Sequence, residues 1–311
     1  MANPINKKII DFLEYLEVDK GLSQATITNY AFYLRRFANF MQKRGISSIE
    51  RLDKQLVHKY RVWLNSLKDK HGESLQRNTQ NYHLIALRSW LKYLIVNDYK
   101  TLEPHRIELA KQEQRQVSFL EGLDLEAILK MPLHTKDEPI IKKRDKAILE
   151  TFFATGLRVS ELARLKIKDI NLSKDEFTVR GKGKKVRLVF ISKNARHWLQ
   201  EYLQIRKDTN SYLFISYDRA NKNSEAGLTA RSIERIVQKY ARLAGITKKV
   251  TPHTLRHSYA TDLLMNGADI RSVQTMLGHS SITTTQVYTH ITDKQSREAY
   301  HAFHGKQRKK R

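Results

Sequence analysis

The first hundred residues place apolar side chains three and four positions apart, which lines them up on one face of an α-helix. Four such stretches are separated by Gly21, Gly45 and Gly72, and glycine favours breaks between helices. Thr26 stands near the start of the second stretch and is expected to cap that helix. The pattern therefore predicts a small helical bundle over residues 1–103. The apolar positions of the four stretches are Ile9, Phe12, Leu13 and Leu16; Tyr30, Leu34 and Phe37; Leu56, Tyr60, Trp63 and Leu64; and Leu84, Leu87, Leu91 and Leu94.

A domain boundary is expected after residue 103, where the apolar periodicity weakens. Pro104 interrupts the pattern, and the polar run KQEQRQ follows from Lys111, a composition typical of a connection between domains. We therefore expect a linker over residues 104–118 and a second domain over residues 119–305. The last six residues, 306–311, form a basic tail, KQRKKR.

The second domain shows a mixed pattern. Two β-rich segments, FTVRG from Phe177 and KVRLVFI from Lys185, flank the turn GKGK and predict a hairpin with a basic tip. Helical spacing predominates elsewhere in this part of the chain. The fold class predicted for the whole chain is therefore mainly α with a small antiparallel β-sheet (α+β). The expected helices lie around residues 147–153, 195–203, 230–243, 253–265 and 270–277, with a last one near Glu298.

Charge narrows the class of partner. The 311 residues carry 57 lysines and arginines against 32 aspartates and glutamates, a formal net charge of +25. Such an excess indicates a polyanionic partner, nucleic acid first of all. Residues 1–118 hold 20 basic and 12 acidic side chains (+8), and residues 119–311 hold 37 and 20 (+17). Because both parts are basic, we expect both domains to touch the polyanion as two halves of a clamp.

The sequence also argues against several other classes of protein. It has no apolar run long enough to span a membrane and no N-terminal segment that resembles a signal peptide. A cytoplasmic protein without a membrane partner is therefore expected. The absence of cysteine removes disulfides, thiolate nucleophiles and every zinc site that needs sulfur.

Four segments of the second domain combine residue types that neither a core nor a surface requires. They begin at Thr155 (TGLRVSEL), Gly181 (GKGKK), Pro252 (PHTLRHSYAT) and Leu277 (LGHSSITTTQVYTH). Together they supply arginines, a lysine, histidines and a tyrosine. This set is suited to phosphoryl transfer without a metal ion.

Breaking a DNA phosphodiester needs charge stabilisation, a nucleophile and proton transfer. Arg158 and Arg256 supply planar guanidinium groups that suit the two non-bridging oxygens. Tyr288 supplies a hydroxyl, and since a free tyrosine has a pKa of about 10, His253 and Lys182 are candidates for moving the protons. The segments contain no acidic cluster that would hold magnesium, so we expect neither a metal ion nor another cofactor.

These segments resemble the catalytic motifs of the tyrosine recombinases and integrases, most closely those of the bacterial and archaeal Xer recombinases. The resemblance covers nearly the whole chain, from KGLSQATITNYAFYLRRF at Lys20 onward. It implies that Glu161 orients the active-site arginine and that Tyr288 is the nucleophile. The catalytic positions of the family fall on Arg158, Lys182, His253, Arg256, His279 and Tyr288.

The resemblance also implies an architecture and a role. It implies an N-terminal helical DNA-binding (core-binding, SAM-like) domain and a tyrosine recombinase catalytic domain that enclose duplex DNA as a C-shaped clamp. The DNA would be a double-stranded recombination site, cleaved and rejoined through a 3′-phosphotyrosine intermediate by a homo-tetramer on two sites. The implied role is Xer-type resolution of chromosome or plasmid dimers, with or without a second recombinase or a cell-division translocase. The alternatives are an integrase or transposase of a mobile element, a type IB topoisomerase and a catalytically inactive DNA-binding accessory protein.

Some of the candidate residues also have an ordinary structural explanation. Arg158 alone would be explained as a surface arginine paired with Glu161. His253 and His257 are one helical turn apart, a spacing found in zinc sites. We do not expect zinc, because Arg256 would place a fixed cation beside the metal and no cysteine completes the site. We interpret His257 as structural.

The hairpin tip and the tyrosine have alternatives of the same kind. Lys182 stands in a basic run with Lys184, Lys185 and Arg187, for which a solvated tip is the alternative explanation. All four are candidates to approach phosphate, and the resemblance singles out Lys182. Tyr288 is one of 14 tyrosines, and a buried aromatic is the ordinary explanation of any of them. Its polar surroundings, TTTQVYTH, argue against a core position.

DNA contacts outside the active site are expected from polar and basic side chains on the helices and at the hairpin tip. A solvated helix face and a solvated tail at residues 306–311 are the alternatives. The predicted contacts are Thr26, Arg77, Thr79, Lys184, Lys185 and Arg231.

Overall fold

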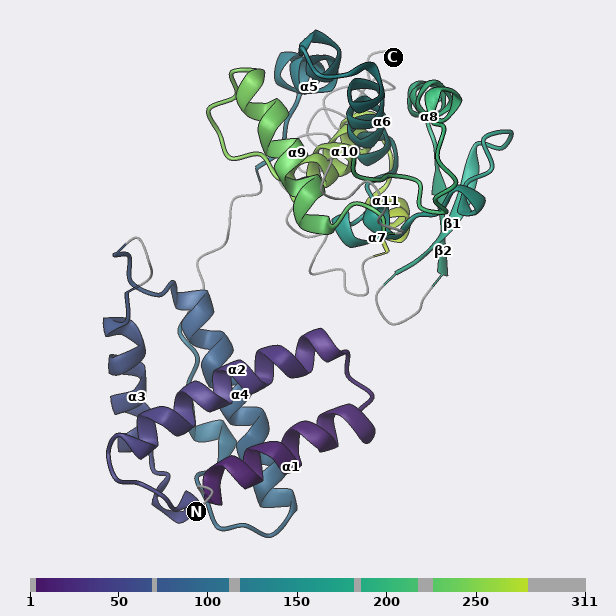
Figure 1. Cartoon of the computed structure of the whole chain (residues 1–311). Helices are drawn as coiled ribbons and strands as arrows, with labels where there is room; N and C mark the ends of the chain where they lie inside the picture. Colours follow the sequence, from purple (N-terminus) through teal and green to yellow (C-terminus); the bar gives the residue numbers. More distant parts are fainter. Residues whose placement is uncertain (1–3, 69–71, 112–117, 182–185, 218–225, 279–311) are drawn as a thin grey trace, which may run out of the picture. The chain divides into compact units, whose positions relative to one another are not determined.

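The computed structural model describes residues 4–68, 72–111, 118–181, 186–217 and 226–278. Within these ranges the protein is mostly helical, with one two-stranded antiparallel sheet (Figure 1). The predicted fold class is therefore confirmed. The chain divides into two compact units, residues 1–114 and 115–311, and each has its own hydrophobic core.

The described part of the first unit is a bundle of four α-helices with two short 3-10 turns. Its core is aromatic, with Phe37, Tyr60 and Trp90 fully buried. The Trp90 indole N–H also donates to the carbonyl of Lys8 at 3.2 Å, which ties the fourth helix to the first. The elements are α1 (Pro4–Val18), α2 (Gln24–Gln42), η1 (Ile49–Arg51), α3 (Lys54–Ser66), α4 (Arg77–Val96) and η2 (Pro104–Arg106).

The start of α2 differs from the sequence prediction, which placed the cap at Thr26. Ser23 is the N-cap: its backbone is extended, and its hydroxyl accepts a hydrogen bond from the Thr26 backbone N–H. Thr26 itself lies inside the first turn, where its hydroxyl is 2.9 Å from that of Ser23. The prediction was wrong because serine caps at least as well as threonine, and the helix begins at Gln24.

Part of the expected linker packs on the first unit. Ile107 of the linker is buried in its core, together with Leu102 just before the linker. The side chain of Asn81 on α4 donates to the carbonyl of Ala110 at 2.9 Å and accepts from its N–H at 3.0 Å. Residues 102–110 are thus attached to α4.

The second unit is built around one buried helix, α6 (Pro139–Thr155), whose Ile148, Leu149 and Phe152 are fully buried. It lies among α8, α9 and α10, with the hairpin at one edge (Figure 1). The other elements are α5 (Gly122–Lys130), η3 (Met131–His134), α7 (Val159–Arg164), η4 (Ile167–Asp169), β1 (Glu176–Arg180), β2 (Val186–Phe190), α8 (Lys193–Ile205), α9 (Ala230–Leu243), α10 (Pro252–Met265) and α11 (Ile270–Leu277).

The hairpin has an inner and an outer face. Phe177 pairs with Val189 and Val179 pairs with Arg187, so these side chains face the core. Val186, Leu188 and Phe190 lie on the outer face and are exposed. The alternation along β2 thus directs one arginine inward.

In the part of the chain that the structure describes, no helix combines the length and the apolar character that crossing a membrane requires.

Candidate phosphate-binding site

The site begins at the turn between α6 and α7. Gly156 ends α6 in the left-handed conformation (φ 57°), and a Cβ at this position would lie 2.4 Å from Cδ1 of Tyr259. Glycine is the residue that adopts this conformation without strain and leaves room for the tyrosine ring. Two residues later, Arg158 serves as the N-cap of α7.

Arg158 is paired with Glu161, and it also reaches a second element. Its backbone N–H donates to the Glu161 carboxylate, and its Nη1 lies 2.9 Å from Oε1 of the same group. Its Nη2 donates to the carbonyl of Gly278 at 3.0 Å, just beyond the end of α11. The side chain remains 29% exposed, so the guanidinium is accessible from solvent. A surface ion pair with Glu161 therefore does not account for all the contacts of Arg158.

Arg256 lies on α10 and joins the carboxyl ends of two helices. Its Nη1 donates to the carbonyl of Gly156 at the end of α6, and its Nη2 donates to the carbonyl of Leu277 at 2.6 Å. Carbonyls in the last turn of a helix lack intrahelical partners and carry the negative end of the helix dipole. Arg256 therefore supplies hydrogen-bond donors that these carbonyls lack, and the same hydrogen bonds offset the cost of burying its charge.

Arg187 is a third arginine of the site, and in the sequence it belongs to the basic run of the hairpin tip. The alternative of a solvated side chain does not hold for it, because the side chain is 10% exposed and forms an ion pair with Glu161 at 2.8 Å. Its Nε donates to the carbonyl of Met276 at 3.1 Å. The missed signal was the alternation of β2, which places Arg187 on the same face as Val189.

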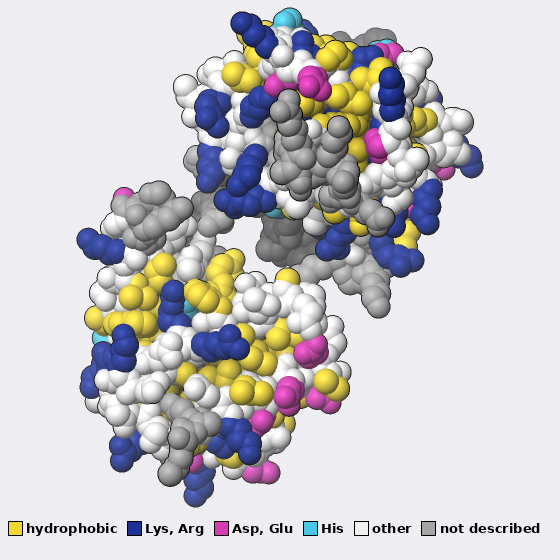
Figure 2. Space-filling model, in the orientation of Figure 1, with side chains coloured by type: hydrophobic (Ala, Val, Ile, Leu, Met, Phe, Trp, Pro, Cys, Tyr) yellow, Lys and Arg dark blue, Asp and Glu magenta, His cyan; other side chains and the backbone are white. Residues whose placement is uncertain are grey.

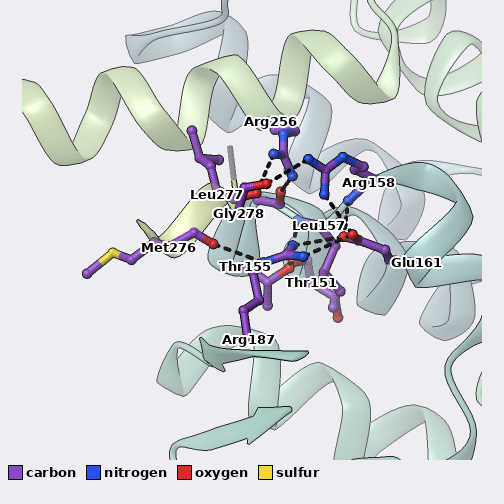
Figure 3. A network of polar contacts seen from close by, with 11 residues as sticks. Thr151, Thr155, Leu157, Arg158, Glu161, Arg187, Arg256, Met276, Leu277 and Gly278 are labelled. Atoms are coloured by element: carbon purple, nitrogen blue, oxygen red, sulfur yellow. Dashed lines mark hydrogen bonds and ion pairs between the residues drawn. The ribbon is translucent and has the colours of Figure 1, made fainter. Parts of the chain in front are cut away.

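The last residues of α11 are therefore held by three different arginines (Figure 3). The carbonyls of Met276, Leu277 and Gly278 accept hydrogen bonds from Arg187, Arg256 and Arg158, respectively. Gly278 allows this crowding because it adopts the left-handed conformation (φ 64°). Figure 3 shows the three guanidinium groups converging on this helix end from β2, α10 and the start of α7.

Glu161 is the anion that connects two of these arginines. Burial alone would raise the pKa of its carboxyl, but hydrogen bonds from Arg187 and Arg158 and the charge of Arg187 hold that pKa at about 2. The carboxylate is thus ionised at neutral pH and offsets part of the positive charge of the cluster.

The two histidines of α10 both have a lowered pKa, which favours the neutral ring. The His253 residue is exposed to solvent, but protein atoms surround part of its ring. This partial desolvation, together with the charges of Arg256 and Arg158, lowers the pKa of His253. Burial, with His253 and Arg256 close by, lowers the pKa of His257 to about 4. Among the described residues, no group of three or more His, Cys, Asp or Glu side chains is placed to hold a metal ion.

The structure brings together four of the predicted site residues: Arg158, Glu161, His253 and Arg256. The remaining predicted residues of the active site and hairpin tip lie outside the described ranges. They are Lys182, Lys184, Lys185, His279 and Tyr288.

The predicted DNA contacts that the structure describes lie in both units. Arg77 is exposed at the first position of α4, and Arg231 is exposed in the first turn of α9. Thr26 on α2 and Thr79 on α4 are half-buried. Figure 2 shows lysine and arginine side chains spread over the visible face of each unit. The assignment of these residues to DNA remains a prediction.

Comparison with known proteins gives matches over almost the entire chain. Residues 118–295 match the phage integrase family, and residues 9–97 match the N-terminal SAM-like domain of phage integrases. The tyrosine recombinase XerD of Listeria innocua is 37% identical over 309 residues, which cover 96% of this chain and 99% of the relative. The tyrosine recombinase XerC of Bacillus subtilis is 36% identical over 309 residues, which cover 96% of each chain.

Solved structures show the same fold. The crystal structure of XerA recombinase is 30% identical and covers 97% of this chain and 99% of its own, with a TM-score of 0.52. The post-cleavage complex of the XerH site-specific recombinase with a palindromic difH substrate has a TM-score of 0.72 at 23% identity. That match covers 96% of this chain and 90% of XerH.

Proposed function

Because the chain belongs to the phage integrase family and is a site-specific recombinase of the Xer type, we propose that it cleaves and rejoins DNA through a covalent bond between Tyr288 and a phosphate. The observation that carries the proposal is the arginine cluster. Arg158 and Arg256 approach the end of α11 from two elements, and the chain that follows this end leads to Tyr288.

The clamp on the phosphate follows from the chemistry of the guanidinium group. The non-bridging oxygens of the phosphate carry negative charge that grows in the transition state, and paired N–H donors stabilise it most when they are already in place. Arg158 presents an accessible edge, and Arg256 is fixed by two carbonyls. His279 would add a hydrogen bond to the same phosphate. In this proposal the fixed cations do the work that metal ions do in two-metal nucleases.

The proton transfers are assigned to His253 and Lys182. The hydroxyl of Tyr288 attacks phosphorus while its proton passes to His253, whose lowered pKa favours the neutral ring that can accept it. The bond from phosphorus to the 5′ oxygen breaks, and Lys182 protonates that oxygen. The product is a 3′-phosphotyrosine, and the reverse attack by a 5′ hydroxyl rejoins the strand without ATP.

The larger assembly extends this proposal. A core-binding domain over residues 1–103 and a catalytic domain over residues 119–305, joined by the linker 104–118, would enclose duplex DNA, with the tail 306–311 beyond. A homo-tetramer on two recombination sites would exchange the strands in pairs. The likeness to the tyrosine recombinases XerC and XerD supports recombination of the Xer type. The role proposed for it is to resolve chromosome or plasmid dimers in the cytoplasm, with or without a second recombinase or a cell-division translocase. Integration of a mobile element would use the same chemistry on a different site.

The Tyr288→Phe variant tests the nucleophile. It should bind the recombination site with unchanged affinity and form no covalent adduct, since only the hydroxyl is lost. Incubation with a labelled, nicked site followed by denaturing electrophoresis measures the adduct. An adduct that persists in the variant would assign the reaction to another residue.

A further inference from the structure

Arg187 occupies a position that normally takes an apolar side chain. It pairs with Val179 across the hairpin and shares the inner face of β2 with Val189, and both valines are buried. A buried guanidinium is costly unless every charge and donor is matched. The groups that match the charge and the donors of Arg187 therefore show which elements it connects.

All three guanidinium nitrogens of Arg187 have partners. Nη1 and Nη2 donate to the two oxygens of Glu161 at 2.9 and 2.8 Å, and Nε donates to the carbonyl of Met276 at 3.1 Å. The stem of the side chain packs against Gly278, where a Cβ would lie 2.9 Å from Cδ of Arg187. One side chain thus connects β2 to α7 and to the end of α11 (Figure 3).

The two residues that fix the Arg158 guanidinium are both contacted by Arg187. Arg158 donates to Oε1 of Glu161 at 2.9 Å and to the carbonyl of Gly278 at 3.0 Å. We propose that Arg187 is a positioning residue of the recombination site: it holds Glu161 and the end of α11 in place, so that Arg158 presents its open edge to the phosphate. The inference rests on the proposed function, in which Arg158 binds that phosphate.

Exposure separates the roles of the two arginines. The Arg158 side chain is 29% exposed, whereas the Arg187 side chain is 10% exposed with every guanidinium nitrogen engaged. Arg187 therefore acts through Arg158 and Glu161 and does not touch the phosphate itself. Because a shift of about 1 Å in a catalytic group can cost roughly 10²-fold in rate, we expect a loss of that order without Arg187.

The test compares Arg187→Ala with a matched control, Arg206→Ala. Arg206 is 2% exposed, pairs with both oxygens of Asp208 at 2.8 and 2.6 Å and donates to the carbonyls of Tyr212 and Leu213. Removing it takes away another buried arginine with a carboxylate partner in the same unit; that partner, Asp208, is 31% exposed, against 6% for Glu161. The measurements on the full chain are thermal stability, affinity for the recombination site and the rate of adduct formation on a nicked site at saturating DNA, per folded molecule.

The expected results differ between the variants. Arg187→Ala should lower the adduct rate by roughly 10²-fold with DNA affinity nearly unchanged, whereas Arg206→Ala should lose stability and keep the wild-type rate. Arg187→Lys, which keeps the charge and loses the paired geometry, should fall between wild type and Arg187→Ala. A wild-type rate in Arg187→Ala, or an equal loss in Arg206→Ala, would reduce Arg187 to a structural role and overturn the proposal.

Two further measurements separate this inference from the function on which it rests. A substrate with a 5′-bridging sulfur needs no acid to protonate its leaving group. Arg187→Ala should therefore stay slow on this substrate. A restored rate would mean that Arg187 assists the protonation assigned to Lys182, and it would contradict the proposal. If wild-type protein formed no adduct, the proposed function would fail, and a crystal structure of Arg187→Ala would still decide. There the Arg158 guanidinium should leave Glu161 or Gly278, and an unmoved guanidinium would refute the positioning role.

Discussion

The surroundings keep one ionisable side chain of the site charged, Glu161, and another neutral, His257. The arginines beside Glu161 keep the pKa of its carboxyl at about 2 in spite of burial. Burial and the positive charge of Arg256, with His253 close by, lower the pKa of His257 to about 4. Glu161 is thus negative between cations, and His257 is neutral among them.

The pKa of His257 predicts how stability depends on pH. An unfolded histidine takes up a proton below pH ~6.5, whereas folded His257 resists protonation until about pH 4. Stability is therefore complete above pH ~6.5 and falls as the pH drops toward 4, by about 3 kcal/mol from this one group. In His257→Gln, which cannot ionise, the free energy of unfolding in urea should change less over this range. An unaltered pH dependence would show that another group is responsible.

At the scale of elements, the site depends on where two helices end. Both α6 and α11 finish at a glycine in the left-handed conformation, Gly156 and Gly278, and both ends present carbonyls to arginines. The glycines stop the helices and leave room for the side chains that pack there. Arg256 touches both ends and therefore fixes their relative position.

Gly156→Ala should destabilise the second unit by about 2–4 kcal/mol, since the methyl group meets the ring of Tyr259 and the backbone is strained. Gly245→Ala is the matched control: its φ of 73° is also positive, but nothing lies within 4 Å of the added Cβ. It should lose only about 1 kcal/mol. Urea unfolding of both variants measures the difference. Equal losses would mean that contact with Tyr259 contributes nothing.

The sequence predicted α9 and α11 at their observed bounds, Ala230–Leu243 and Ile270–Leu277, because each buries one periodic apolar face. It predicted no helix at α5 and only residues 147–153 of α6, which is buried on nearly all sides. It predicted the start of α2 less well, since serine and threonine near the start compete as caps. The Glu161 partner of Arg158 was predicted, but the backbone partners of the arginines were out of reach of the sequence. Arg256 donates to Gly156, 100 positions earlier in the chain, and only the packing of α6 against α10 makes that contact.

Arg187 was missed for a different reason. Its sequence neighbours are basic, so it was considered only as part of the hairpin tip, either solvated or near phosphate, although the alternation of β2 directs it to the same face as Val189. A charge at an inward strand position requires a buried counterion, here Glu161. The basic neighbours in the sequence indicated an exposed side chain, whereas the alternation of the strand indicated a buried one. The alternation was the correct guide.

At the scale of the whole molecule, the excess of positive charge belongs to both units, and each unit has its own core. A polyanion is attracted wherever basic side chains gather, without regard to sequence. Charge alone therefore predicts affinity for DNA, and the arginine cluster predicts the chemistry.

Because charge governs DNA binding and the arginine cluster governs the chemistry, binding and cleavage should respond differently to salt and to a chelator. Binding should weaken by about 10³-fold between 50 and 200 mM salt if roughly six phosphates are contacted. Adduct formation at saturating DNA should survive excess EDTA, because guanidinium groups stabilise the phosphate. Filter binding and the nicked-site assay measure the two effects. Loss of cleavage in EDTA that magnesium or zinc restores would contradict the proposed site.

The three carbonyls at the end of α11 have a thermodynamic consequence for ligand selection. One N–H group of Arg158, of Arg187 and of Arg256 is already engaged with a backbone oxygen, so an anion at the open edge of Arg158 shares the positive charge of the cluster with these oxygens. The net gain from a small anion such as inorganic phosphate is correspondingly low. A duplex that also contacts basic side chains elsewhere adds free energy that a small anion lacks. We therefore expect the cluster to favour polyvalent ligands over free inorganic phosphate.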